Sequence, residues 1–313
     1  MRNKAVSLLS VPFGLGGARQ GAELGPKVLI EAGIVRHLTN LNIQVINEGE
    51  VILPPVAAAS ELTAIDTSTK QFVSASTNLK YLNEIIMLNT VAADRVSNIV
   101  EQGHFPLILG GDHSISIGTI AGIRRHYRNL GVIWFDAHGD LNTEATSPTG
   151  NIHGMSLAVN LGQGHPLLTQ IHQSAYPIDP SKVVIIGARS LDQGEREYIR
   201  SFGVTCFTMH DIDRKGMLRV MEEALAIVGS GTDGVHLSFD IDSLDPYEAP
   251  GTGTPVQGGV NYREAHLALE LMHESGLITS AEFVEVNPTL DQNKRTVLLA
   301  NGLICSLLGQ TIL

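Results

Sequence analysis

The chain has 313 residues, of which 43% are hydrophobic and 17% are charged, so it carries enough apolar material for one large core. Its formal net charge of −11 argues against nucleic acid or an anionic membrane surface as the main partner, and is compatible with a cationic small molecule. No stretch resembles a membrane span or a signal peptide, which predicts a soluble, cytoplasmic protein with no membrane partner.

Strand-like apolar runs alternate with helical periods along most of the chain. The predicted strands are residues 5–12, 43–47, 106–109, 132–140, 183–186, 204–207, 235–242 and 278–286. The predicted helices are about 25–32, 76–101, 116–127, 212–228, 262–274 and 294–308, and residues 51–70 are predicted to be a surface excursion. This alternation is typical of a three-layer α/β/α fold with a mostly parallel central sheet. With no composition break or repeat, residues 1–313 are predicted to form a single domain.

The central predicted strand, residues 132–140, ends in residues that suit a metal ion. Asp136, His138 and Asp140 stand at positions i, i+2 and i+4, so a strand-like backbone would aim all three the same way. Two carboxylates and an imidazole converge on one point only if a cation lies between them. A divalent metal is the simplest such cation.

Two other predicted strands end in the same kinds of side chain. Residues 235–242 end in Asp240 and Asp242, and residues 106–109 lead into Gly-Gly-Asp112-His113. The carboxyl ends of parallel strands form the crevice where ligands bind in α/β sheets. The sequence therefore predicts one pooled metal-ligand set: His113, Asp136, His138, Asp140, Asp240 and Asp242.

The composition of this set indicates both the metal and the chemistry. Two histidines and four carboxylates exceed the needs of one tetrahedral zinc ion and suit two metals bridged by shared carboxylates. Oxygen-rich ligands without a thiolate favour Mn²⁺. A pair of metals bridging a water lowers its pKa and makes a hydroxide nucleophile, so the expected reaction is a hydrolysis.

A polar loop, residues 141–154, follows the central strand directly and is predicted to contact a substrate. Composition alone leaves open an ordinary solvent-exposed loop. The same alternative applies to His153, which on sequence alone reads equally well as a surface histidine.

Three motifs, taken together, resemble those of the ureohydrolases, the family of arginase, agmatinase and formiminoglutamase. They are Gly-Gly-Asp-His-Ser at 110–114, Asp-Ala-His-Gly-Asp at 136–140 and Ser-Phe-Asp-Ile-Asp-Ser-Leu-Asp-Pro at 238–246. The resemblance covers essentially the whole chain. It implies a parallel α/β sheet, two Mn²⁺ ions per subunit and hydrolysis of a guanidinium group to urea.

The resemblance also divides the ligands between two ions. His113, Asp136, Asp140 and Asp240 are similar to the ligands of one Mn²⁺, and Asp136, His138, Asp240 and Asp242 to those of the other, so that Asp136 and Asp240 bridge. Asp112 and Asp245 flank these ligands and are expected to make turn or supporting hydrogen bonds.

Within the family, the arginase branch, in its bacterial type, is the closer match. The 142–151 loop resembles the arginase pattern and implies that Asn142, Thr149 and Asn151 hold the α-carboxylate of L-arginine, while Asp192 meets its α-ammonium. The remaining implied substrate contacts are Glu195, Thr254 and Glu285, the last of which pairs with the guanidinium.

The resemblance implies a mechanism in which the metal-bridging hydroxide converts L-arginine to L-ornithine and urea. Asp140 transfers a proton to the departing amine, and His153 shuttles protons with solvent. An agmatinase or another guanidino-substrate ureohydrolase is the alternative, and a catalytically silent binding subunit is a further one. The family implies a homotrimer or homohexamer and a place in arginine metabolism and the urea cycle.

Overall fold

The computed structural model describes residues 5–53, 78–172 and 175–312. Its framework is one sheet of eight parallel strands in the order β2-β1-β3-β8-β7-β4-β5-β6. The strands are β1 (Val6–Val11), β2 (Val45–Glu50), β3 (Phe105–Gly110), β4 (Leu130–Phe135), β5 (Val183–Ala188), β6 (Thr205–Thr208), β7 (Gly234–Asp240) and β8 (Ile278–Val284). The predicted α/β class and parallel sheet are confirmed.

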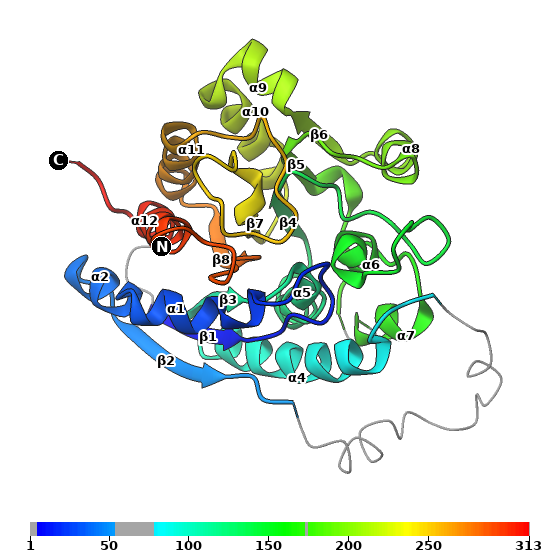
Figure 1. Cartoon of the computed structure of the whole chain (residues 1–313), viewed down its shortest axis with the longest axis horizontal. Helices are drawn as coiled ribbons and strands as arrows, with labels where there is room; N and C mark the ends of the chain where they lie inside the picture. The colour runs from blue at the N-terminus through cyan, green and yellow to red at the C-terminus, as the bar shows by residue number, and fades with distance from the viewer. Residues whose placement is uncertain (1–4, 54–77, 173–174, 313) are drawn as a thin grey trace.

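Helices cover both faces of this sheet (Figure 1). The α-helices are α1 (Gly25–Glu31), α2 (Ile34–Asn40), α4 (Leu82–Glu101), α5 (Ser116–Arg124), α6 (Ser156–Asn160), α7 (Pro166–Thr169), α8 (Gln193–Phe202), α9 (Met209–Lys215), α10 (Met217–Gly229), α11 (Tyr262–Ser275) and α12 (Arg295–Leu307). Short 3-10 turns include η3 (His113–Ile115), η4 (Ile152–Met155) and η7 (Ile241–Ser243). In the described part of the chain, no helix is long and apolar enough to cross a membrane.

Strand alternation divides the apolar side chains between two cores, one on each face. Ile133 and Phe135 of β4 pack in the core shared with α10, α11 and α12, while Val132 and Trp134 point into the core shared with α4 and α5. Because both faces are covered, β4 is buried along its whole length. The sheet is therefore a rigid frame whose carboxyl edge positions the loops beyond it.

Several local predictions differ from the structure, and helices α2, α6 and α7 were not predicted. The predicted helix over 212–228 is two helices, α9 and α10, separated at Gly216, whose φ of 78° is left-handed. Helix α8 was not predicted, because its sequence is largely polar and buries only Glu195 and Tyr198. The helix predicted from residue 76 starts at Leu82 among the described residues, and most of the 51–70 excursion lies outside them.

Candidate metal centre and active site

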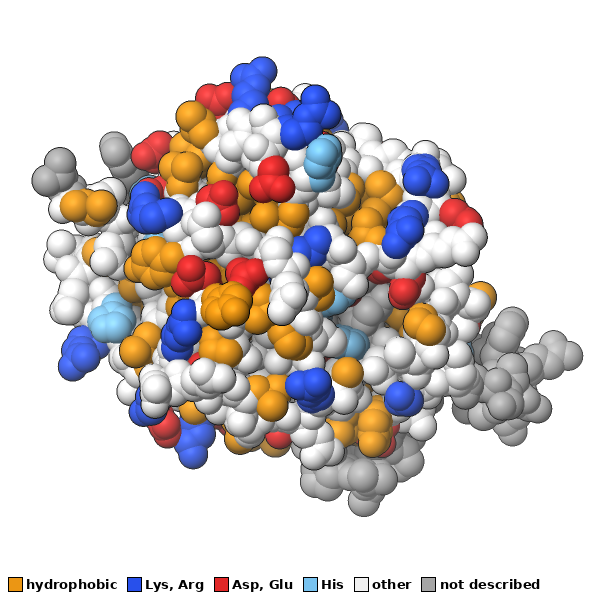
Figure 2. Space-filling view, turned by 45° about the horizontal axis from the view of Figure 1, so that its top comes forward, with side chains coloured by type: hydrophobic (Ala, Val, Ile, Leu, Met, Phe, Trp, Pro, Cys, Tyr) orange, Lys and Arg blue, Asp and Glu red, His pale blue; other side chains and the backbone are white. Residues whose placement is uncertain are grey.

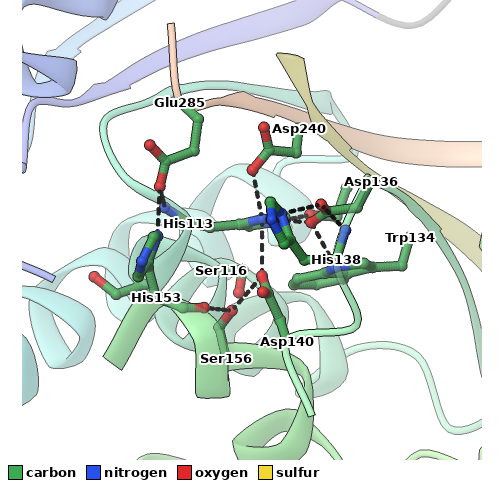
Figure 3. A network of polar contacts seen from close by, with 12 residues as sticks. His113, Ser116, Trp134, Asp136, His138, Asp140, His153, Ser156, Asp240 and Glu285 are labelled. Atoms are coloured by element: carbon green, nitrogen blue, oxygen red, sulfur yellow. Dashed lines mark hydrogen bonds and ion pairs between the residues drawn. The ribbon is translucent and has the colours of Figure 1, made fainter. Parts of the chain in front are cut away.

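The six predicted metal ligands lie together at the carboxyl edge of β3, β4 and β7, and Figure 3 labels all of them except Asp242. Five of them form two overlapping groups, His113–Asp136–Asp140 and Asp136–His138–Asp242, whose ligand atoms lie within 4.8 Å of one another in each group. His113 follows β3 and Asp136 follows β4 directly. The prediction that three strand ends pool these residues agrees with this geometry.

The first group is arranged around His113. Its Nδ1 atom lies 3.1 Å from Oδ2 of each of Asp136, Asp140 and Asp240. Asp140 reaches this point through a left-handed backbone, with φ of 50°, rather than by strand alternation. The predicted strand geometry is thus wrong for 136–140, since β4 ends at Phe135 and the ligands lie on the turn beyond it.

The second group shares Asp136 with the first. His138 Nδ1 lies 3.4 Å from Asp136 Oδ1 and 3.2 Å from Asp242 Oδ2. The two oxygens of Asp136 therefore face the two groups separately, as a bridging carboxylate requires. Asp240 contacts His113 through Oδ2, which places Asp240 in the first group. Its other oxygen, Oδ1, accepts a hydrogen bond of 2.7 Å from the Asp242 N–H.

Hydrogen bonds behind His113 fix which ring nitrogen carries the proton in its neutral form. The Ser238 hydroxyl donates its one proton to Glu282 Oε1 at 2.7 Å, so the 2.8 Å contact between His113 Nε2 and Ser238 Oγ requires an N–H on the histidine. In the neutral imidazole, Nδ1 then carries a lone pair facing three carboxylates. Nδ1 is buried and has no well-aligned hydrogen-bond partner in the described structure. A lone pair and three carboxylates repel one another, so this donor set fits a metal cation.

The charges of the cluster perturb one another strongly. Burial opposes the charged imidazolium of His113, but the three carboxylates around it raise its pKa well above the ordinary value. Burial likewise opposes charge on His138, but Asp242 and Asp136 raise its pKa to about 12. Burial and the neighbouring carboxylates Asp242 and Asp136 raise the pKa of Asp240. A cluster that carries more carboxylates than it has cations to neutralise favours a bound metal ion.

Two buried groups around the ligands were not predicted. The Trp134 ring stacks on His113 with centroids 4.1 Å apart, and its indole N–H donates to Asp136 Oδ2 at 3.0 Å. Ser238 supports His113 as described above. Both residues stand two positions before a ligand, on the same face of their strands, and that spacing was the available signal.

The flanking aspartates have the supporting roles expected of them. Asp112 accepts from the N–H groups of Gly16, at 2.7 Å, and Ser114, at 3.0 Å. Burial and the charge of Glu285 raise the Asp112 pKa to about 6. Asp245 accepts from the Tyr247 N–H within a turn, and from the Gly258 N–H of a segment thirteen residues further on.

A cavity opens beside the second group, and most of the predicted substrate residues line it. Figure 2 shows a hollow on this side of the molecule with histidine side chains at its edge, among scattered basic and acidic groups. The predicted residues in the cavity lining are His138, Asp140, Asn142, Thr149, Asn151, His153, Asp192, Glu195, Asp240, Asp242 and Thr254. Thr254 Oγ1 also donates to Asp242 Oδ2 at 2.9 Å, which couples the lining to a metal ligand.

Glu285 lies behind this lining rather than in it. Its Oε1 atom is 3.0 Å from His153 Nδ1 and accepts from the His113 N–H at 3.0 Å (Figure 3). Glu285 also has a left-handed backbone, with φ of 62°. Burial opposes charge on His153, but its pairing with Glu285 raises its pKa to about 9. Strained backbones at both Asp140 and Glu285 are typical of functional sites.

Glu195 connects the substrate loop to the start of α8. Its carboxylate accepts from the Leu141 N–H at 3.1 Å and from the Asp192 N–H at 2.8 Å. Burial raises its pKa to about 7. Glu195 thus connects the turn that follows β4 to Asp192, the residue predicted to contact the α-ammonium.

The fold and the site together define a parallel α/β protein with a candidate two-metal centre and an adjoining polar cavity. Comparison with known families gives the identity: the model of the arginase family matches residues 4–309. An arginase from Bacillus subtilis is 49% identical over 311 residues, covering 99% of this chain and all of that protein. The chain belongs to the arginase family.

Solved structures agree with this assignment. The native arginase structure from Bacillus caldovelox is 47% identical, covers 99% of this chain and all of that one, and has a TM-score of 0.91. A structure described as a hypothetical agmatinase from Burkholderia thailandensis is 25% identical, covers 98% of this chain and 85% of that one, and has a TM-score of 0.72. The predicted family is confirmed.

Proposed function

We propose that this protein is a metal-dependent hydrolase that converts L-arginine to L-ornithine and urea. The observation that carries the proposal is the position of Asp136, shared between two histidine–carboxylate groups beside a cavity lined by amide and carboxylate side chains. Curated relatives at 48–49% identity over their full length are named arginases. A solved arginase from Entamoeba histolytica, 34% identical, is described in complex with L-ornithine.

The proposed cofactor is two Mn²⁺ ions per subunit, held by the ligand sets expected from the sequence. Hard carboxylate oxygens with imidazole, and no thiolate, support manganese. Two bound divalent ions lower the pKa of a shared water and supply a nucleophile near neutral pH. In the structure, Asp136 is already oriented toward both groups.

The protein's own side chains are proposed to move the protons. The attacking water forms the new C–O bond at the guanidinium carbon, and Asp140 accepts the proton that the water releases. Asp140 then delivers that proton to the amine nitrogen of ornithine as the C–N bond breaks. His153, on η4 beside Glu285, exchanges protons between the site and solvent. Glu285 orients the guanidinium and holds His153.

The cavity is proposed to select an amino acid over an amine. Asn142, Thr149 and Asn151 supply uncharged donors to the α-carboxylate, and Asp192 accepts from the α-ammonium. Glu195 and Thr254 complete the set. Hydrogen bonds to charged groups are worth about 1.5–3 kcal/mol each, so two or three of them separate arginine from agmatine by about two to six orders of magnitude in kcat/KM.

The wider organisation is also part of the proposal. One continuous sheet supports a single domain over residues 1–313. A homotrimer or homohexamer, a cytoplasmic location and a place in arginine metabolism rest on the family resemblance. Size-exclusion chromatography with light scattering distinguishes the two oligomers.

The first experiment is urea release after Mn²⁺ loading at alkaline pH, with arginine and agmatine side by side. Strong preference for arginine supports both the reaction and the roles of the 142–151 loop. Preference for agmatine keeps the metal centre and overturns the carboxylate contacts. No urea from either substrate overturns the proposed reaction, and metal content then separates another guanidino substrate from a silent homologue.

A further inference from the structure

The segment that leads into α4 packs directly on the substrate loop. The Lys80 backbone N–H donates to the Gly150 carbonyl at 3.0 Å, and the Lys80 ammonium donates to Asn151 Oδ1 at 2.9 Å. Gly150 has a φ of +72°, and a Cβ there would lie 2.1 Å from the Asn78 carbonyl oxygen. Backbone and side-chain contacts thus fix residues 78–80 against residues 150–151.

The contact with Lys80 determines which way the Asn151 amide faces. An ammonium group has only donors, so the atom that meets it must be the amide oxygen. The Asn151 nitrogen is then directed elsewhere, and no described residue accepts a hydrogen bond from it. Asn151 is 8% exposed and lines the cavity, so its nitrogen is a donor available to a ligand.

The charge of Lys80 complements the cavity. Among the described residues that line it, five are carboxylates and none is lysine or arginine; the carboxylates are Asp140, Asp192, Glu195, Asp240 and Asp242. Three of these are proposed metal ligands, so in the metal-loaded protein Asp192 and Glu195 are the lining carboxylates that face an entering ligand carboxylate without an ion of their own. Lys80 places a positive charge immediately behind the amide that is proposed to receive that carboxylate.

We propose that Lys80 is a specificity-determining residue, which rests on the proposed function. It acts through Asn151, by fixing the amide nitrogen as the donor and by favouring a negative charge beside it. Its effect falls on substrates that carry an α-carboxylate, and not on the chemical step. It is a positioning residue and does not touch the reacting atoms.

The test is Lys80→Met, which keeps the aliphatic stem and removes the ammonium. The KM for arginine should rise about 10-fold, with kcat within about 2-fold of wild type, because one charge-assisted contact near the carboxylate is lost. The kcat/KM for agmatine, which has no carboxylate, should change less than 2-fold. Calorimetry should show weaker binding of L-ornithine and unchanged binding of putrescine. Lys80→Arg should restore most of the loss.

Matched variants make the result decisive. Lys27→Met, at an exposed lysine of α1 outside the cavity lining, should leave all constants unchanged. In Asn151→Ala, adding Lys80→Met should cost much less than it does in the wild type. Full additivity, or equal losses on arginine and agmatine, overturns the proposal. Unchanged arginine kinetics in Lys80→Met overturns it while the proposed function stands, whereas a wild type inactive on arginine overturns both.

Discussion

Asn142 Nδ2 donates a hydrogen bond of 2.8 Å to Asp192 Oδ2, so the two ends of the proposed amino-acid site are bonded to each other. Asn142 Oδ1 in turn accepts from Thr146 Oγ1 at 3.0 Å, which fixes the amide orientation. Asp192 is the N-cap of α8, and Glu195 completes its capping box. The proposed carboxylate donor and ammonium acceptor are therefore held at a set separation by a helix start.

This relationship predicts different selectivity for the two residues. Asn142→Ala should lower kcat/KM for arginine by about 10-fold or more, and that for agmatine by less, because only arginine has the carboxylate. Asp192→Asn should lower both, because both substrates carry the amine. Paired urea-release assays measure this. Asn40→Ala, at an exposed asparagine of α2, serves as the control. Equal losses on both substrates in Asn142→Ala would contradict the assignment.

Asp136→Asn should remove metal and activity together, because one residue serves both groups. Metal analysis after dialysis should show a loss at both sites, with turnover falling in parallel. Asp94→Asn, at an exposed aspartate that pairs with Arg125, should retain both. Normal metal content with normal turnover in Asp136→Asn would refute the bridging role.

The hydrogen bonds behind His113 give a prediction about metal affinity. Ser238→Ala removes the acceptor of the His113 Nε2–H, and should weaken metal binding about 10–100-fold. Titration of the metal-free protein by calorimetry measures the change without relying on activity. Ser10→Ala is the control, since Ser10 is buried and its hydroxyl has no partner in the described structure. Equal affinity in the two variants would show that Ser238 does not position His113.

The ligand set could be predicted from the sequence because each ligand stands within a few residues of an apolar strand. Asp136 and Asp240 could be predicted from a single rule, that ligands bind at the carboxyl ends of parallel strands. The turn at Asp140 could not be predicted, because a left-handed φ at a non-glycine residue is imposed by the surrounding structure and not by local preference.

Hydrogen-bond partners that lie far apart in the sequence were the second feature that could not be predicted. Glu285 lies 132 residues from His153 in the chain, and Ser238 lies 125 residues from His113, so no local spacing reveals either pair. Lys80 was missed for the same reason, since its partner Asn151 is 71 residues away. Helix α8 was missed because most of its residues are polar, and its start depends on a capping box between Asp192 and Glu195.

His153→Asn should retain both metals and lose most of kcat. A positioned acid or base contributes about 10²–10⁴-fold to such a reaction, so a loss in that range is expected. Metal analysis and steady-state kinetics on the same preparation separate the two effects. His37 of α2, half-buried and outside the cavity lining, offers a control, His37→Asn, which should match the wild type. An unchanged kcat in His153→Asn would leave His153 without a role in proton transfer.

The pairing of His153 with Glu285 also predicts how stability depends on pH in the metal-free protein. The His153 pKa is raised to about 9 in the folded state, against about 6.5 when unfolded. Below pH 6.5 both states carry the proton, and the stabilisation is complete. Between pH 6.5 and 9 only the folded state carries it, so the free energy of unfolding falls as pH rises, by up to about 3 kcal/mol in all.

His153→Asn removes this titration. Urea denaturation at pH 6, 7.5 and 9 should therefore show the wild type losing stability relative to His153→Asn as pH rises, with most of the change above pH 6.5. His37→Asn should follow the wild type, because the ion pair is intact in it. Parallel pH profiles for wild type and His153→Asn would mean that the ion pair with Glu285 does not form in solution.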